Sequence, residues 1–174
     1  MIFLVLLRET IEQDIPEIYR YIHLSYVTKY CDDPEKQWKT HEKWYKFLIN
    51  SDSYVMYTIT NSENGQFYGC VKFELEGECA IINVYLIEEI RHKGYSEKII
   101  ELSIGELQIK HPEISIVLAY ILEENTPSLS AFKHLKFQYD GVEEYKGLDH
   151  MLFIKTLKLS LIHISEPTRR VVIS

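Results

Sequence analysis

The 174-residue sequence has few cysteines, glycines and prolines. Cys31, Cys70 and Cys79 are an odd number without Cys-x-x-Cys spacing, which argues against a disulfide framework and a zinc site. Free thiols fit a reducing compartment, so we expect a cytoplasmic protein that binds no metal. Seven glycines and five prolines beside 46% apolar residues exclude a collagen-like repeat and an intrinsically disordered chain.

Long apolar runs and basic side chains are also scarce. The apolar run over residues 2–7 is followed by Arg8 and Glu9, so it is too short for a signal core or a membrane helix. The chain has 19 Lys and Arg against 26 Asp and Glu, a net charge of -7, and therefore lacks a broad basic face for phosphates. We expect no membrane partner and no nucleic-acid partner.

The patterns that are present alternate between strand and helix over a length that fits one domain. Strands are expected over residues 2–7, 54–60, 67–75, 79–87, 114–122, 137–139 and 150–156. Helices are expected over residues 14–24, with Asp14 as N-cap, and over 33–49, 95–111 and 125–135. Asn64-Gly65 and Glu76-Gly77 are typical hairpin turns. This order predicts an α+β domain with helices around one central sheet.

A six-residue segment, Arg91-His92-Lys93-Gly94-Tyr95-Ser96, stands between an expected strand and an expected helix. Unpaired N–H groups and the helix dipole favour an anion at such a place. Gly94 allows close approach of the backbone to a ligand, and Lys93 adds positive charge. A diphosphate would suit this segment, although an ordinary exposed turn has the same composition.

A second pattern follows about thirty residues later, in Asn125, Ser128, Phe132, Leu135 and Phe137. The first segment resembles the Arg/Gln-x-x-Gly-x-Gly/Ala acyl-CoA loop of the GNAT acetyltransferase superfamily, and the second resembles that family's Asn-x-x-Ala/Ser helix, which ends in Gly-Phe. With residues 7–10 and Asp14, the resemblance covers residues 6 to about 156. It implies a GNAT-like central mixed, mostly antiparallel sheet flanked by about four helices.

The resemblance implies acetyl-CoA as co-substrate, no metal, and an extended pantetheine arm paired like an added strand. The residues it assigns to cofactor binding are Val84, Tyr85, Leu86, Arg91, His92, Lys93, Gly94, Tyr95, Ser96, Asn125 and Phe132. Asn125 is equally typical of a plain helix N-cap. Three positions depart from the family pattern: His92, Ser96 and Lys136 each replace a usual small residue.

The roles of general base and general acid, which many relatives give to a Glu and a Tyr, cannot be assigned to the matching positions of this sequence, because Tyr120 and Phe132 stand there. A phenol is a poor base near neutrality, and Phe cannot protonate a thiolate. Our catalytic candidates are the Val84 N–H for the oxyanion, and Asn83 and Tyr120 to hold water. Weaker titratable candidates, each also typical of a surface or packing residue, are Glu74, Glu124, His23 and His41.

Residues 41–45, 68–73 and 120–125 resemble the GNAT branch that acts on nucleotide-linked amino sugars in pseudaminic and related nonulosonic acid synthesis. This implies direct acetyl transfer to the primary amine of a small molecule, with Arg8, His41 or Lys72 as a local anion contact. The alternatives are a protein or peptide N-acetyltransferase and an acyl-CoA-binding domain without turnover. We expect a monomer or a homodimer.

Residues 159–169 look like translated sequencing-adapter DNA rather than evolved protein. We therefore expect a GNAT acetyltransferase domain over residues 1–158 and a non-native tail without function over residues 159–174. The last strand of the domain should end near residue 156, and Pro167 would interrupt any further central strand.

Overall fold

The computed structural model describes residues 3–22, 34–91, 94–157 and 168–173. The strands are β1 (Phe3–Glu9), β2 (Tyr54–Asn61), β3 (Phe67–Glu76), β4 (Cys79–Leu86), β5 (Ile116–Ile121), β6 (Gln138–Tyr145), β7 (Leu148–Thr156) and β8 (Thr168–Ile173). The helices are η1 (Glu12–Asp14, a 3-10 turn), α1 (Ile15–Ile22), α2 (Pro34–Asn50), α3 (Glu88–Arg91), α4 (Tyr95–Lys110) and α5 (Thr126–His134).

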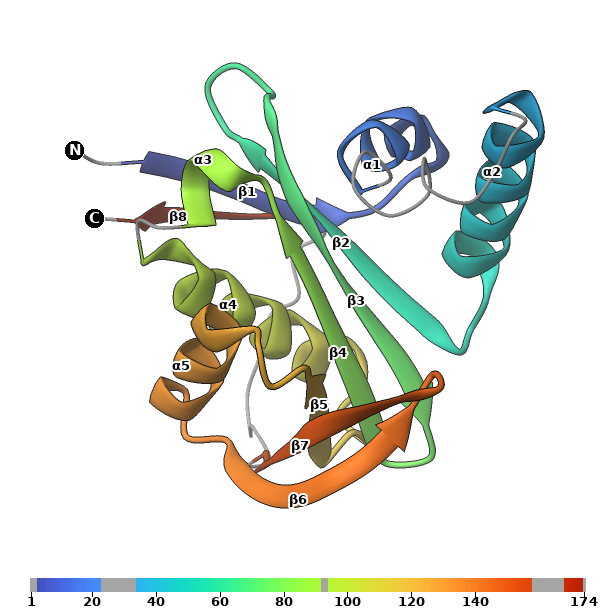
Figure 1. The fold of residues 1–174 in the computed structure, drawn as a ribbon. Coiled ribbons are helices and arrows are strands. Elements are labelled where there is room, and N and C mark those ends of the chain that lie inside the picture. Colours follow the sequence, from blue (N-terminus) through green and yellow to red (C-terminus); the bar gives the residue numbers. More distant parts are fainter. Residues whose placement is uncertain (1–2, 23–33, 92–93, 158–167, 174) are drawn as a thin grey trace.

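The strands form one sheet in the order β6-β7-β5-β4-β3-β2-β1-β8, in which only β4 and β5 are parallel neighbours. α1 and α2 lie on one side of the sheet, and α4 and α5 lie on the other (Figure 1). The predicted α+β class, with a mixed and mostly antiparallel sheet, is confirmed. The short α3 was not predicted, because four residues are too few to show a helical period.

The core lies mainly between the sheet and α4. Val71, Phe73 and Val117 are fully buried on the strands, and Ile99 and Leu107 are buried on α4. These side chains belong to one continuous apolar cluster that extends from β1 to β7. The central strands are therefore fixed from one face, which leaves the other face of β3 to β5 for polar side chains.

Asp14 has a different role from the predicted N-cap of the first helix. It is buried, and its two carboxylate oxygens accept hydrogen bonds from the Arg8 guanidinium at 2.7 Å each. Asp14 Oδ2 also accepts from Thr58 Oγ1 at 3.1 Å and from the Ile11 N–H at 2.9 Å. The bidentate pair ties β1 to the start of α1, so Arg8 is already occupied and is a poor anion contact for a substrate.

β8 pairs antiparallel with β1 at the edge of the sheet, from Thr168 opposite Arg8 to Ile173 opposite Phe3. The two ends of the chain therefore lie side by side (Figure 1). This strand comes from the segment that the sequence assigns to a non-native tail, and it begins directly after Pro167. β7 ends at Thr156, where the last strand of the domain was expected to end, and β8 is an additional strand at the edge of the sheet, where a preceding proline is tolerated.

Candidate active site

The site begins where two parallel strands separate. β4 and β5 pair only from Cys79 to Ile81 and from Ile116 to Leu118, although β4 continues to Leu86 and β5 to Ile121. A cavity of about 670 Å³ is lined by the diverging parts of both strands, by α3, α4 and α5, and by one residue of β7. Through this gap between β4 and β5, a ligand in an extended conformation can reach the strand backbone at the centre of the domain.

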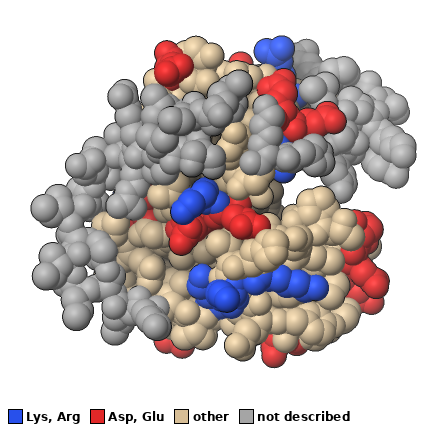
Figure 2. Space-filling view, turned by 90° about the vertical axis from the view of Figure 1, so that its left-hand side faces the viewer, with Lys and Arg blue, Asp and Glu red and all other residues tan. Residues whose placement is uncertain are grey.

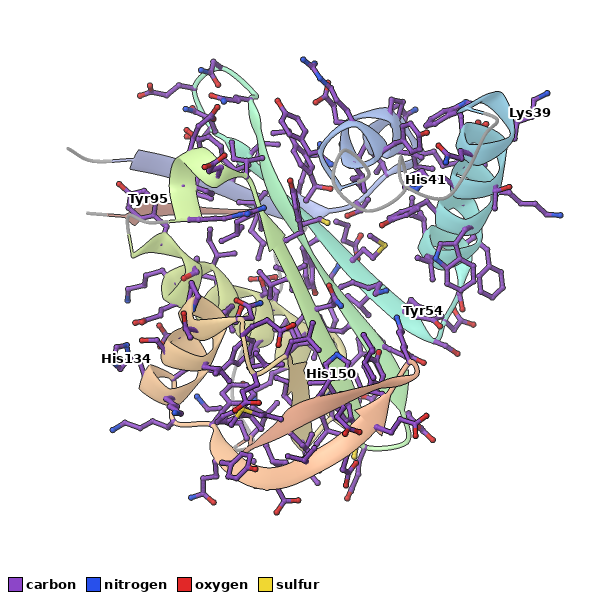
Figure 3. All side chains as sticks on the ribbon, viewed as in Figure 1. Lys39, His41, Tyr54, Tyr95, His134 and His150 are labelled. Carbon is purple, nitrogen blue, oxygen red and sulfur yellow. The ribbon has the colours of Figure 1, made fainter. Side chains whose placement is uncertain are left out.

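The cavity brings together most of the residues predicted from the sequence. Among its lining residues are Asn83, Val84, Tyr85, Leu86, Arg91, Ser96, Tyr120, Asn125 and Phe132. Tyr95 begins α4, and its side chain is buried in the core, so it can serve a ligand only through its backbone (Figure 3). His92 and Lys93 lie outside the described residues.

The backbone of β4 determines which groups face the gap. Hydrogen-bonded and non-hydrogen-bonded pairs alternate along an antiparallel ladder, and the Ile87 N–H donates to Tyr68 O at 2.9 Å. Tyr85 and Asn83 lie two and four residues before Ile87, so their backbone N–H and C=O groups also form hydrogen bonds to β3. Val84 lies between these two residues and forms a non-hydrogen-bonded pair with Val71. Its N–H and C=O therefore point away from β3 and toward the gap. The Val84 amide thus has the orientation expected of an oxyanion donor.

The start of α4 closes one part of the cavity. Gly94 is its N-cap, with φ +76° and ψ 11°, a left-handed conformation that suits glycine. Ser96 lies in the first turn and lines the cavity, where the first N–H groups of the 16-residue helix have no helical acceptor. Arg91 lines the same cavity, and its Nε donates to Leu86 O while its guanidinium lies over the Tyr85 ring.

Figure 2 shows the side of the molecule that carries α4 and α5, with lysine and arginine side chains in a row below a group of acidic and basic ones. Lys98 on α4 and Lys133 and Lys136 at the end of α5 are exposed. The net charge of -7 is therefore not spread evenly over this side. Local basic groups decide whether an anion is tolerated here, because charges beyond a Debye length are screened.

α5 contributes Asn125 and Phe132. The Asn125 side chain accepts a hydrogen bond from the Ser128 N–H at 3.4 Å, which confirms its N-cap role, and Asn125 also lines the cavity. Phe132 packs edge-on against Phe137 with ring centroids 4.9 Å apart. Lys136, where the family pattern has glycine, has φ +70°, so the chain keeps the left-handed conformation at a steric cost of about 1–2 kcal/mol.

Tyr120 has two aromatic partners that the sequence did not indicate, Tyr145 and His150. The Tyr120 and Tyr145 rings stack at 4.3 Å with an angle of 7° between planes, and His150 meets them edge-on at 6.4 and 5.6 Å. Burial, followed by the charge of Glu143, raises the pKa of Tyr120, so this phenol is an even poorer base than an exposed tyrosine. The β5–β7 pairing that creates this cluster joins residues about thirty positions apart, so no local sequence pattern marks it.

A lysine lies on the same face of the sheet. Lys72 is half-buried on β3, opposite Asn83 in the ladder, and Asn83 shares its face with Tyr120 across the β4–β5 register. Burial and the positive charge of Lys146 lower the pKa of Lys72, while Glu74 opposes this shift. The face therefore carries a cation whose charge is incompletely balanced by its surroundings.

The weaker titratable candidates do not meet at the cavity. His41 is buried between α1 and α2, with its ring 4.8 Å from Tyr19 and 4.2 Å from Tyr45, which is a packing role. Glu124 is exposed before α5, and Glu74 lies on β3 beside Lys72. Neither glutamate lines the cavity, and His23 lies outside the described residues.

Two further properties concern only the part of the chain that the structure describes. No helix there is both long and apolar enough to cross a membrane. No group of three or more His, Cys, Asp and Glu side chains there is arranged to hold a metal ion. Among the described residues, the polar groups that line the cavity are backbone amides, amide and hydroxyl side chains, the Glu88 carboxylate, the Arg91 guanidinium and the His150 imidazole.

Parallel central strands that part around a cavity, with a glycine-capped helix at its border, define the architecture of an acyl-transferring GNAT domain. The family model described as an acetyltransferase (GNAT) domain matches residues 5–138, and the chain belongs to this family. The activity of an acetyltransferase follows from this membership. The resemblance stated from the two sequence motifs is therefore confirmed at the level of the family.

Solved structures agree with this assignment. Spermidine N-acetyltransferase SpeG from Vibrio cholerae, in a dodecameric intermediate state, is 15% identical with a TM-score of 0.71, over 87% of this chain and 93% of that chain. A domain from Methanocaldococcus jannaschii is 18% identical with a TM-score of 0.69, over 88% of this chain and 98% of that one. At these identities the likeness shows the fold alone. No curated protein sequence matches the chain.

Proposed function

We propose that the protein transfers the acetyl group of acetyl-CoA directly to the primary amine of a small molecule. The observation that carries this proposal is the outward Val84 N–H in a cavity that also reaches the start of α4. The first amides of α4 would hold the CoA diphosphate, and the backbone from Val84 to Leu86 would pair with pantetheine. The sequence adds the amides of His92 and Lys93 to this cradle.

The amine nitrogen would attack the thioester carbonyl carbon, and the carbon–sulfur bond would then break to release the CoA thiolate. The Val84 N–H would donate to the oxygen that becomes negative in the tetrahedral intermediate. Asn83 and Tyr120 would hold water on the acceptor side. Burial raises the pKa of Cys70 to about 12, and neither Cys70 nor Cys79 lines the cavity, which favours direct attack over a thioester on the enzyme.

Gly94→Asp should weaken acetyl-CoA binding more than the same-shape change Gly94→Asn. A Cβ at Gly94 would meet nothing within 4 Å, and both variants share the cost of a left-handed backbone, but only Asp places a carboxylate next to the proposed diphosphate. We expect a Kd difference of about tenfold or more between the two variants by isothermal titration, corresponding to about 1.4 kcal/mol. Equal affinities would contradict a diphosphate at this helix.

We propose a nucleotide-linked amino sugar as the acceptor. Lys72 and Lys146 place positive charge on the acceptor face, where a diphosphate would balance it. Trp44 and Phe47 stack at 5.6 Å, are about half exposed and lie edge-on to Tyr54, which suits a flat nucleobase. A polyamine, the substrate in the names of the Vibrio structures, would instead add positive charge beside Lys72.

Acceptor choice is tested by CoA release from a UDP-linked 4-amino sugar, a ribosomal N-terminal peptide and spermidine at matched concentrations. We expect the sugar to be fastest, and Lys72→Met to lower kcat/KM for the sugar about tenfold while leaving or raising that for spermidine. Preference for the peptide or for spermidine would reject the sugar. Tight acetyl-CoA binding without release from any acceptor would favour the domain without turnover.

A further inference from the structure

The proposed reaction needs a proton acceptor, because an amine is largely protonated at neutral pH and only its neutral form attacks a thioester. Tyr120, at the position where many relatives carry a glutamate, has a raised pKa and cannot act in this way near neutrality. The described residues that line the cavity include one imidazole, that of His150 on β7. Imidazole is the side chain that exchanges protons most readily near neutral pH.

The strand register places His150 on the acceptor face. Tyr120 pairs with Leu152, and alternate residues of a strand share a face, so His150 lies on the same face as Tyr120. Asn83 and Lys72 were placed on that face by the β3–β4–β5 register. Figure 3 shows His150 between β4 and the β6–β7 hairpin, where the strands around the cavity diverge.

A hydrogen bond fixes which imidazole nitrogen is basic. His150 Nδ1 lies 2.8 Å from the Leu148 carbonyl oxygen. A carbonyl oxygen only accepts hydrogen bonds, so Nδ1 carries the hydrogen and the lone pair of the neutral ring is on Nε2. The edge-on contacts with the stacked Tyr120 and Tyr145 rings restrict the imidazole on one side, and the Leu148 carbonyl fixes its Nδ1 edge. His150 is thus held in one orientation and one tautomer, as a general base requires.

Several charged and titratable groups surround this imidazole. Glu143 on β6 is its ladder partner, and Tyr145 and Lys146 follow at the hairpin turn. Tyr120 faces it from β5, and Glu88 and Arg91 line the same cavity from α3.

We propose that His150 is the general base of the transfer reaction, with Nε2 accepting one proton from the acceptor ammonium directly or through a water shared with Asn83. The neutral amine then attacks the thioester carbon, and the carbon–sulfur bond breaks. The second amine proton passes to the CoA thiolate, and His150 releases its proton to solvent. The products are the acetamide, CoA thiol and one proton. This role rests on the proposed function.

The test compares His150→Gln with the wild type and with His134→Gln. His134 is exposed on α5, pairs with Glu97 at 2.8 Å and does not line the cavity, so it controls for the loss of a histidine. We expect His150→Gln to lower kcat/KM about 10²- to 10³-fold at pH 7 with unchanged acetyl-CoA affinity, and His134→Gln to have no effect. The deficit should shrink at alkaline pH, where free amine is abundant, and added imidazole should partly rescue His150→Ala. Wild-type kcat/KM and pH profile in His150→Gln would overturn the proposal.

A second measurement does not depend on turnover. Imidazole ¹⁵N spectra of the wild-type protein with CoA bound should show a protonated Nδ1 and an unprotonated Nε2 for the neutral ring of His150. A protonated Nε2 would overturn the role of His150. Absence of CoA binding or of turnover with every amine would instead contradict the proposed function, so the two failures are distinguishable.

Discussion

Gly69→Ala should destabilise the protein by at least about 3 kcal/mol, the upper end of the usual cost of overpacking. A Cβ built on Gly69 would lie 2.1 Å from the Tyr85 carbonyl oxygen and 3.0 Å from Leu86 Cα. These are backbone atoms of β4, so relief requires the strand itself to move and not a side chain to turn. For a chain of this size, the melting temperature should fall by about 6–12 °C.

Gly65→Ala is the matched control for this effect. Gly65 has φ +74° in the β2–β3 turn, and a Cβ there would meet nothing within 4 Å, so only the backbone conformation is penalised. We expect a loss of about 1–2 kcal/mol for Gly65→Ala in thermal or urea unfolding. Equal losses of unfolding free energy in the two variants would show that β4 can move away from Gly69 at little energetic cost. Because the clash is at Tyr85 and Leu86, Gly69→Ala should also weaken acetyl-CoA binding.

The order of the helices and strands was predictable because each element has its own local pattern of apolar residues, bounded by turn residues. The hairpins at Asn64-Gly65 and Gly77 occur as predicted, and both glycines have positive φ. The β6–β7 hairpin was predicted poorly: residues 137–139 were expected as a strand, and β6 in fact continues to Tyr145. Most of β6 is exposed, and its register shifts between Tyr139 and Val142, so neither face shows a regular apolar alternation.

The two halves of the candidate site also differ in how well the sequence predicts them. The segment from Arg91 to Ser96 and the Asn125 helix are each a short continuous stretch, so the resemblance of each to a family motif could be recognised from the sequence. The proposed acceptor side depends on Lys72, Tyr120 and His150 sharing one face of the sheet, and they come from three separate strands. Their meeting follows from the antiparallel pairing of β5 with β7 beyond the gap, and pairing partners are not encoded in a strand's own pattern.

Val84→Pro should lower kcat about 10²- to 10³-fold, because proline removes the one N–H that the proposed mechanism assigns to the oxyanion. The substitution is tolerable in this central strand, since the Val84 N–H points away from β3 and no ladder bond between β3 and β4 is lost. Asn83, which precedes it, is already extended, as a residue before proline prefers. Acetyl-CoA affinity should fall no more than about tenfold, the value of one hydrogen bond.

Val84→Ala keeps the N–H and controls for the lost side chain, so it should retain turnover within about tenfold of the wild type. Replacement of the Val84 amide by an ester, through the α-hydroxy analogue of valine, removes only the N–H and guards against a folding effect of proline. Both N–H deletions should show the same loss of kcat while circular dichroism and acetyl-CoA binding report an intact domain. Full turnover in the ester variant would remove Val84 from the mechanism and assign the oxyanion to another hydrogen-bond donor at the cavity, such as the Asn83 side-chain amide.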